Sequence, residues 1–294
     1  SLSDFSITGP FDTAIYGSNV GDVEIKNVTI DGGGAGHDGI VIDQSDTSGT
    51  ANIDIDNVSI TGLTHDGIDL NVNGTSGGTS TTNLNVSNST VHVGHDGVAV
   101  TSSASGASNL TVYAGIHDST IVAGGTGTAM SGTTSPGATL NQSIVVDPTA
   151  ISGGLYGVHI TATADGGSFT QNISLSDVTI SNVSKGGVVI SASADEAGTL
   201  DQGIDITNLD IASTDTPFSI SAKADHNATL QQSLTADHLS VGVGASNNLG
   251  FYASAHNGGA LSQTFALSHV TADNAPADGV YMYVSSDSGA PAIQ

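Results

Sequence analysis

Asn27-Val28-Thr29-Ile30 returns along the chain with only small changes. The clearest copies are Asn57-Val58-Ser59-Ile60, Asn88-Ser89-Thr90-Val91, Asp118-Ser119-Thr120-Ile121 and Asp177-Val178-Thr179-Ile180. Weaker copies begin at Asp147, Asn208, His238 and His269, so that successive copies start 29 to 31 residues apart. A constant period of this length indicates a solenoid, in which each repeat stacks on the one before it.

Two further patterns keep the same period. Glycine recurs at positions 39, 67, 97, 127, 157 and 187, each time before an alternating triplet such as Ile40-Val41-Ile42. Leucine recurs at positions 110, 140, 200, 230 and 261, mostly with a glutamine two residues later, at 142, 202, 232 and 263. Apolar residues also stand two positions before each copy of the first motif and four positions before nearly every copy, as Ile25 and Val23 do. Period-two spacing of β-branched residues predicts strands, three of them in each repeat.

These patterns predict an all-β protein, a single right-handed parallel β-helix of nine to ten coils, each with about 30 residues and three strands. Equivalent residues of neighbouring coils would then stack about 4.8 Å apart. We expect one domain over residues 1–294, with an irregular N-terminal coil at 1–21 and regular coils at 22–290, as a fragment of a larger exported protein. A β-sandwich fits less well, because its strand spacings vary.

Charge and composition exclude several classes of protein. The chain has 28 acidic residues against 3 lysines or arginines, a net charge of −25. Nucleic-acid binding needs clustered basic residues, so we expect no nucleic-acid partner. Without cysteine the chain has no disulfide and no zinc-thiolate site. No apolar run approaches the roughly 18 residues of a membrane helix, so we expect this segment not to span a membrane.

Asparagine or aspartate stands first in most copies of the opening motif. Both residues tolerate the left-handed backbone conformation and bond to neighbouring backbone groups. We therefore expect a tight turn at this position in each coil.

A histidine–aspartate pair precedes the glycine in three successive repeats. The pairs are His37-Asp38, His65-Asp66 and His95-Asp96. If the period is correct, three imidazoles and three carboxylates stack at one corner, where they could hold a divalent cation. The alternative is that Asp-Gly simply makes the bend and that the histidine is an exposed polar residue.

Calcium is the one cofactor that the sequence suggests. Asp165, Asp195 and Asp225 form a second acidic series at spacings of 30 residues, and carboxylate oxygens suit Ca²⁺. Residues 33–41 also match the calcium-binding nonapeptide of RTX proteins, although neighbouring repeats lack its paired glycines. The alternative for these aspartates is ordinary solvation in an acidic protein.

Tyr252, Tyr281 and Tyr283 fall at outward-facing positions of the repeat. His159 occupies the same register in an earlier repeat. Rows of exposed aromatic rings can stack on sugar rings. These four residues are therefore candidates for contact with a glycan.

The repeat resembles those of bacterial autotransporter passenger regions, the pertactin-like and pectin-lyase-like β-helix adhesins. The residues that carry this resemblance are Asn27–Ile30 with His37–Ile42, Asn57–Ile60 with His65–Leu70, and Asn88–Val91 with His95–Val100. The resemblance implies a secreted or bacterial cell-surface protein that binds a glycan, a host surface or a copy of itself. Adhesins of this kind have no catalytic residues to carry over to this sequence.

Two other functions stay open. A β-helical carbohydrate-active enzyme, a hydrolase or a lyase or epimerase, would act on a polysaccharide. Uronate chemistry needs cationic groups, and Lys26, Lys185 and Lys223 lie in different registers, so a neutral glycan and two carboxylates fit better. A calcium-stabilised structural segment of an exported protein is the third possibility. Because the repeats stay uniform, we expect binding rather than catalysis.

Overall fold

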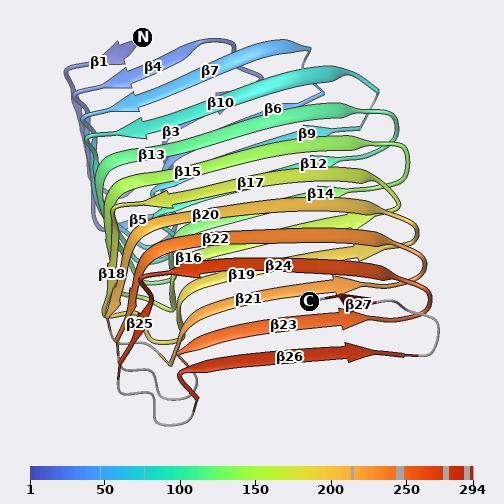
Figure 1. The fold of residues 1–294 in the computed structure, drawn as a ribbon. Helices are drawn as coiled ribbons and strands as arrows, with labels where there is room; N and C mark the ends of the chain where they lie inside the picture. Colours follow the sequence, from blue (N-terminus) through green and yellow to red (C-terminus); the bar gives the residue numbers. More distant parts are fainter. Residues whose placement is uncertain are drawn as a thin grey trace.

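The structure, a computed structural model, describes residues 1–46, 48–75, 77–212, 215–242, 248–273, 278–287 and 292–293. Over these ranges the regular structure is entirely β-strand, with no helix. The strands wind into a β-solenoid with the two chain termini toward opposite ends of the stack (Figure 1). The predicted fold class is therefore confirmed. Nothing in these ranges has the helical length and apolar character required to cross a bilayer.

Two parallel sheets form the walls of the solenoid (Figure 1). The smaller sheet consists, among the described residues, of β3 (Thr13–Ser18), β6 (Asp38–Ser45), β9 (Ile68–Gly74), β12 (Val98–Ala104), β14 (Thr126–Thr134), β16 (Tyr156–Asp165), β19 (Gly186–Asp195), β21 (Thr216–Ala224), β23 (Leu249–Ala255) and β26 (Val280–Ser286). The larger sheet consists, over the same ranges, of β1 (Leu2–Ser3), β2 (Ser6–Thr8), β4 (Val23–Lys26), β5 (Thr29–Gly36), β7 (Gly49–Asp56), β8 (Ser59–Leu63), β10 (Thr79–Ser87), β11 (Thr90–Val93), β13 (Asn109–Ala123), β15 (Thr139–Ser152), β17 (Ser168–Ser176), β18 (Val178–Ser181), β20 (Thr199–Ala212), β22 (Thr229–Val241), β24 (Ala260–Ser268), β25 (Thr271–Ala272) and β27 (Ala292–Ile293).

The strand register shows about eight complete turns. Nine residues pair one above another in consecutive coils: Val23, Ile53, Leu84, Ala114, Ile144, Ile173, Ile204, Leu234 and Phe265. The predicted count of nine to ten coils was slightly high because it included incomplete turns at the ends. Three separate strands per coil are found in the first coils and again at β17, β18 and β19. In contrast, β13, β15, β20 and β22 each run continuously through two of the predicted strands.

The opening coil is more regular than the sequence predicted. Residues 1–21, expected to be irregular, contain β1, β2 and β3, which pair in parallel with β4, β5 and β6. Leu2 pairs with Ile25, and Ser6 pairs with Thr29. These partners are only 23 residues apart, so the first coil is shorter than the repeat and a search for the longer period misses it.

Left-handed backbone is found at the first residue of the repeated motif, as predicted. Asn27, Asn57, Asn88 and Asn208 have φ values of 51 to 54°. The prediction was wrong for Asp147, which pairs with His117 and lies one position before the turn. Pro148 takes the turn position in that coil, where proline cannot adopt a positive φ.

The interior of the solenoid is a stack of aliphatic rows. One row, fully or almost fully buried, contains Ile30, Ile60, Val91, Ile121, Ile151, Ile180, Ile211 and Val241. Beside these rows runs a glutamine ladder, defined as Gln142, Gln171, Gln202, Gln232 and Gln263. Each Nε2 from Gln171 onward donates to Oε1 of the preceding glutamine at 2.5 Å. The predicted leucine–glutamine pattern omitted Gln171, because Phe169 replaces leucine in that coil.

A glycine column, defined as Gly39, Gly67, Gly97, Gly127, Gly157 and Gly187, lies where the chain enters the strands of the smaller sheet. A Cβ on Gly67 would stand 2.6 Å from the carbonyl oxygen of Gly97, and a Cβ on Gly97 would stand equally close to that of Gly127. None of the six has a positive φ. Glycine is therefore required here by close approach of the next coil, and not by the turn conformation.

Candidate functional site

The three predicted histidine–aspartate pairs do stack at one corner. The rings of His37 and His65 lie face to face with centroids 3.5 Å apart, and the rings of His65 and His95 are 6.0 Å apart. His95 Nδ1 is 2.6 Å from Asp66 Oδ1. This hydrogen bond is the main reason why the pKa of His95 is raised above its ordinary value.

The aspartates of this corner also hold the turns together. Asp66 Oδ1 accepts a hydrogen bond from the backbone N–H of Asp96 at 3.0 Å, and Asp96 Oδ1 accepts one from Thr126 at 2.6 Å. Asp66, His95 and Asp96 nevertheless offer ligand atoms within 4.8 Å of one another, near enough for one metal ion. The structure thus supports the turn interpretation and leaves the metal hypothesis geometrically open.

A groove of about 440 Å³ lies on the outer face of the smaller sheet, next to this corner. Its long axis follows one row of residues across β9, β12, β14 and β16: Asp69, Ala99, Ala129 and His159. The groove exists because two alanines lie between two larger side chains. Asn71, Thr101, Ser131 and Thr161 line one side, and Asp66 and Asp96 reach it from the corner.

Asp69 carries the most unusual carboxyl group of the groove. Burial raises its pKa to about 6, and the neighbouring charges of Asp66, Asp43 and Asp38 add to this effect. Asn71 Nδ2 donates to Asp69 Oδ2 at 3.0 Å, which opposes the shift. A carboxyl group that is partly protonated near neutral pH is a frequent mark of a functional site. The sequence search missed Asp69, although it is an acidic residue at an outward position where neighbouring coils have Val41 and Ala99.

His159, a predicted glycan contact, forms the opposite end of the groove. Burial lowers the pKa of its imidazole. The ring stacks on Tyr156 with centroids 4.8 Å apart. A neutral imidazole fixed against an aromatic ring can both donate and accept hydrogen bonds.

The three predicted tyrosines lie apart from the groove. Tyr281 shares the row of His159 but follows it by four strand spacings, roughly 19 Å. Tyr252 and Tyr283 pair with each other in the next outward row. The rings of Tyr252 and Tyr281 are 5.7 Å apart, so the tyrosines form an aromatic patch of their own on β23 and β26.

Two of the three aspartates in the second acidic series, Asp195 and Asp225, are already engaged by other side chains. Asp165 pairs with Asp195 on adjacent strands. Asp195 Oδ1 is 2.7 Å from His226 Nδ1, a contact that lowers the pKa of Asp195. Asp225 accepts from Asn257 at 2.8 Å and faces Lys223 Nζ at 3.2 Å; the hydrogen bond from Asn257 is the largest cause of its pKa near 2. These contacts account for the carboxylates of Asp195 and Asp225 without an ion.

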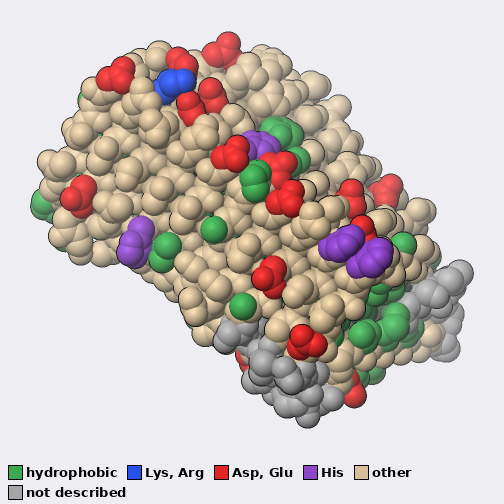
Figure 2. Space-filling model, turned by 60° about the vertical axis from the view of Figure 1, so that its left-hand side comes forward, with side chains coloured by type: hydrophobic (Ala, Val, Ile, Leu, Met, Phe, Trp, Pro, Cys, Tyr) green, Lys and Arg blue, Asp and Glu red, His purple; other side chains and the backbone are tan. Residues whose placement is uncertain are grey.

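Surface charge is overwhelmingly negative. Acidic side chains are spread over the face that Figure 2 shows, where blue basic atoms are seen in one place only. Lys26 pairs with Asp56 at 2.9 Å. A second hollow of about 430 Å³, on the outer face of the larger sheet, is lined by small polar residues such as Ser143, Asn172 and Ser233. It has no charge arrangement comparable with that around Asp69.

No protein-family model, curated protein or solved structure matches this chain. The assignment of a parallel β-solenoid therefore rests on the register of the chain's own strands.

Proposed function

We propose that this chain is a glycan-binding segment of a secreted or cell-surface protein, comparable in role to the β-helix adhesins that its repeat resembles. The observation that carries the proposal is the groove between Asp69 and His159. Hydroxyl and amide groups along one side can bond to sugar hydroxyls, and the methyl groups of Ala99 and Ala129 offer a floor for the apolar face of a sugar ring. A net charge of −25 favours a neutral glycan over an acidic one.

Many copies of the solenoid on one surface would make such a shallow groove effective. Short sugars bind weakly to shallow sites, and many identical rods on one surface convert weak contacts into firm attachment. A host surface rich in glycan, or the glycan coat of a neighbouring cell, fits this description. Self-association is the other partner that the sequence suggested, and the groove gives it no particular support.

Binding to a panel of neutral and acidic oligosaccharides, followed by calorimetry, tests the proposal. Ala129→Leu would fill the floor of the groove and should abolish binding. Ser219→Leu places the same side chain in the same row on β21, outside the groove, and should leave binding intact. Equal binding by both variants, or binding by neither the wild type nor the control, would refute the groove as the glycan site.

One observation favours catalysis as a second candidate function. Asp69, with its pKa near 6, can donate a proton, and the carboxylates of Asp66 and Asp96 line the same groove. An acid and a base are the two groups that glycoside hydrolysis requires. Asp69→Asn would then abolish sugar release but preserve binding. No release of sugar by the wild-type chain from any glycan that it binds would eliminate hydrolysis and leave the binding function.

A further inference from the structure

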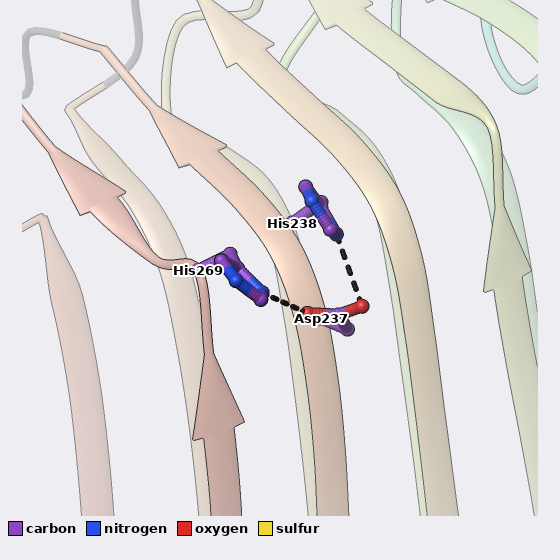
Figure 3. A group of neighbouring side chains, drawn as sticks. All are labelled: Asp237, His238 and His269. Atoms are coloured by element: carbon purple, nitrogen blue, oxygen red, sulfur yellow. Dashed lines mark hydrogen bonds and ion pairs between the residues drawn. The ribbon is translucent and has the colours of Figure 1, made fainter.

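A second histidine–aspartate cluster lies far from the groove, at the left-handed bend within β22 and directly after the end of β24 (Figure 3). Asp237 stands between His238 and His269. His238 Nδ1 is 3.0 Å from Asp237 Oδ2, and His269 Nδ1 is 2.7 Å from Asp237 Oδ1. The two imidazole rings stack in consecutive coils with centroids 4.5 Å apart. Both rings therefore direct a nitrogen to the same carboxylate.

The fold does not require histidine at either position. His238 and His269 have φ values of 55° and 50°, the left-handed turn that asparagine or aspartate occupies in earlier coils. There, amide side chains form the contacts between coils, as when Asn208 Nδ2 donates to Asp177 Oδ1 at 2.9 Å. Asparagine would satisfy the same backbone at 238 and 269. The two histidines thus replace the usual turn residue at the same position of two consecutive coils.

The carboxylate of Asp237 has different hydrogen-bond partners from the carboxylates of Asp66 and Asp96. Asp66 and Asp96 accept hydrogen bonds from backbone N–H groups of the next coil. Asp237 instead accepts from side chains, the two imidazoles and the hydroxyl of Ser268 at 2.7 Å. An ion that displaced the histidine protons would leave the turn intact, and Ser268 Oγ would still donate to Asp237 Oδ1 and orient the carboxylate.

The three side chains are also accessible and close enough to share an ion. The side chains of His238 and His269 are 56% and 69% exposed. One ligand atom from each of the three lies within 4.8 Å of the other two. A tetrahedral zinc ion with bonds of about 2.0–2.1 Å needs ligand atoms about 3.3 Å apart. Because both imidazoles are exposed, they have room to rotate toward that separation.

We propose that Asp237, His238 and His269 bind a divalent transition-metal ion, with Zn²⁺ as the best fit. Two imidazoles and one carboxylate are borderline ligands that suit Zn²⁺, Ni²⁺ or Cu²⁺, whereas Ca²⁺ and Mg²⁺ take oxygen ligands. Three protein ligands leave a fourth position open to water or to a group from another molecule. This site is independent of the glycan groove, which lies on the other sheet.

Calorimetric titration of the full chain with zinc chloride tests the site. His238→Asn and His269→Asn restore the residue that the repeat has at this turn, so both variants should keep the circular dichroism spectrum and melting curve of the wild type. Each should weaken zinc binding by at least roughly tenfold, since loss of a group that merely supports a ligand already costs that much. His226→Asn is the matched control. His226 is also left-handed and pairs with Asp195 and Asp225, but among the described residues it belongs to no group of three ligands near enough to share an ion.

The other candidate cluster requires its own variant. His95→Asn removes the imidazole of the Asp66, His95 and Asp96 group and should leave the affinity at the Asp237 site unchanged. Zinc binding that is kept by His269→Asn but lost by His95→Asn would overturn the proposal. Undetectable zinc binding by the wild type, or equal weakening by His226→Asn, would also overturn it.

Discussion

Replacing Gln202 by leucine should destabilise the solenoid more than the size of one side chain suggests. Gln202 is fully buried and is a middle rung of the glutamine ladder. Its Nε2 donates to Gln171 Oε1, and its Oε1 accepts from Gln232 Nε2, both at 2.5 Å. Leucine has a similar volume, so no large cavity forms. The loss comes from two buried polar groups that are left without their partner, each at a cost of about 1–3 kcal/mol.

The expected total for Gln202→Leu is roughly 2–6 kcal/mol. The lower half of this range applies if the Gln232 amide turns fully to the carbonyl oxygen of Ser221, now 3.4 Å away. Domains are stable by only about 5–15 kcal/mol, so a loss of this size is a large fraction of the total.

Gln263 provides the matched comparison. It is as buried as Gln202, but in the described part of the chain its Oε1 has no hydrogen-bond partner. Gln263→Leu therefore strands one ladder oxygen, Gln232 Oε1, and also removes the longer bond to the carbonyl oxygen of Tyr252 at 3.3 Å. It should cost about 1–3 kcal/mol. Urea denaturation followed by circular dichroism measures both variants, and the midpoint should fall further for Gln202→Leu. An equal or smaller effect at Gln202 would refute the idea that the ladder acts through paired amides.

Three other predictions concern the corner, the groove and calcium. Gly97→Ala should lower stability by about 1–3 kcal/mol through overpacking, because its Cβ would collide with Ile121 Cγ2. Gly21→Ala is the control, since its Cβ meets nothing within 4 Å, and it should change the melting temperature little. Equal effects of the two variants on the melting temperature would contradict the close-approach argument. Asp69 has a folded-state pKa near 6, above its ordinary 3.8, so its contribution favours folding at low pH and is lost as the pH rises from about 4 through 6. Asp69→Asn should remove that part of the pH dependence of the melting temperature. An unchanged dependence on pH would show that Asp69 is not responsible. Adding a calcium chelator should leave the melting temperature unchanged, because Asp195 and Asp225 already have partners; a marked drop would instead support a calcium-stabilised segment.

The sequence predicted the fold well because the repeat appears directly in residue types. Glycines 67, 97 and 127 recur at one spacing, and the strands that follow them pair in that register. The errors arose where a coil departs from the common pattern. Pro148 took the turn position that Asp147 was expected to fill, and the first coil is too short for the period.

The candidate sites were harder to predict for a related reason. A search for recurring residues found the stacked pairs from His37 to Asp96, and the structure brings them together. Asp69 escaped that search, and His238 and His269 were recognised only as weaker copies of the turn motif, because each replaces the residue that the repeat normally has. The raised pKa of Asp69 also depends on burial within the groove, which the spacing of residues in a sequence does not report.

The glycine column limits how proteins of this design can change in length. A Cβ on any of these glycines would stand within 2.7 Å of a carbonyl oxygen of the next coil, so an insertion that shifts one coil by a residue would set a side chain against that carbonyl. Gain or loss of an entire coil keeps every such contact. Evolution can therefore lengthen or shorten this molecule by duplicating or deleting whole turns, while smaller insertions are confined to the bends.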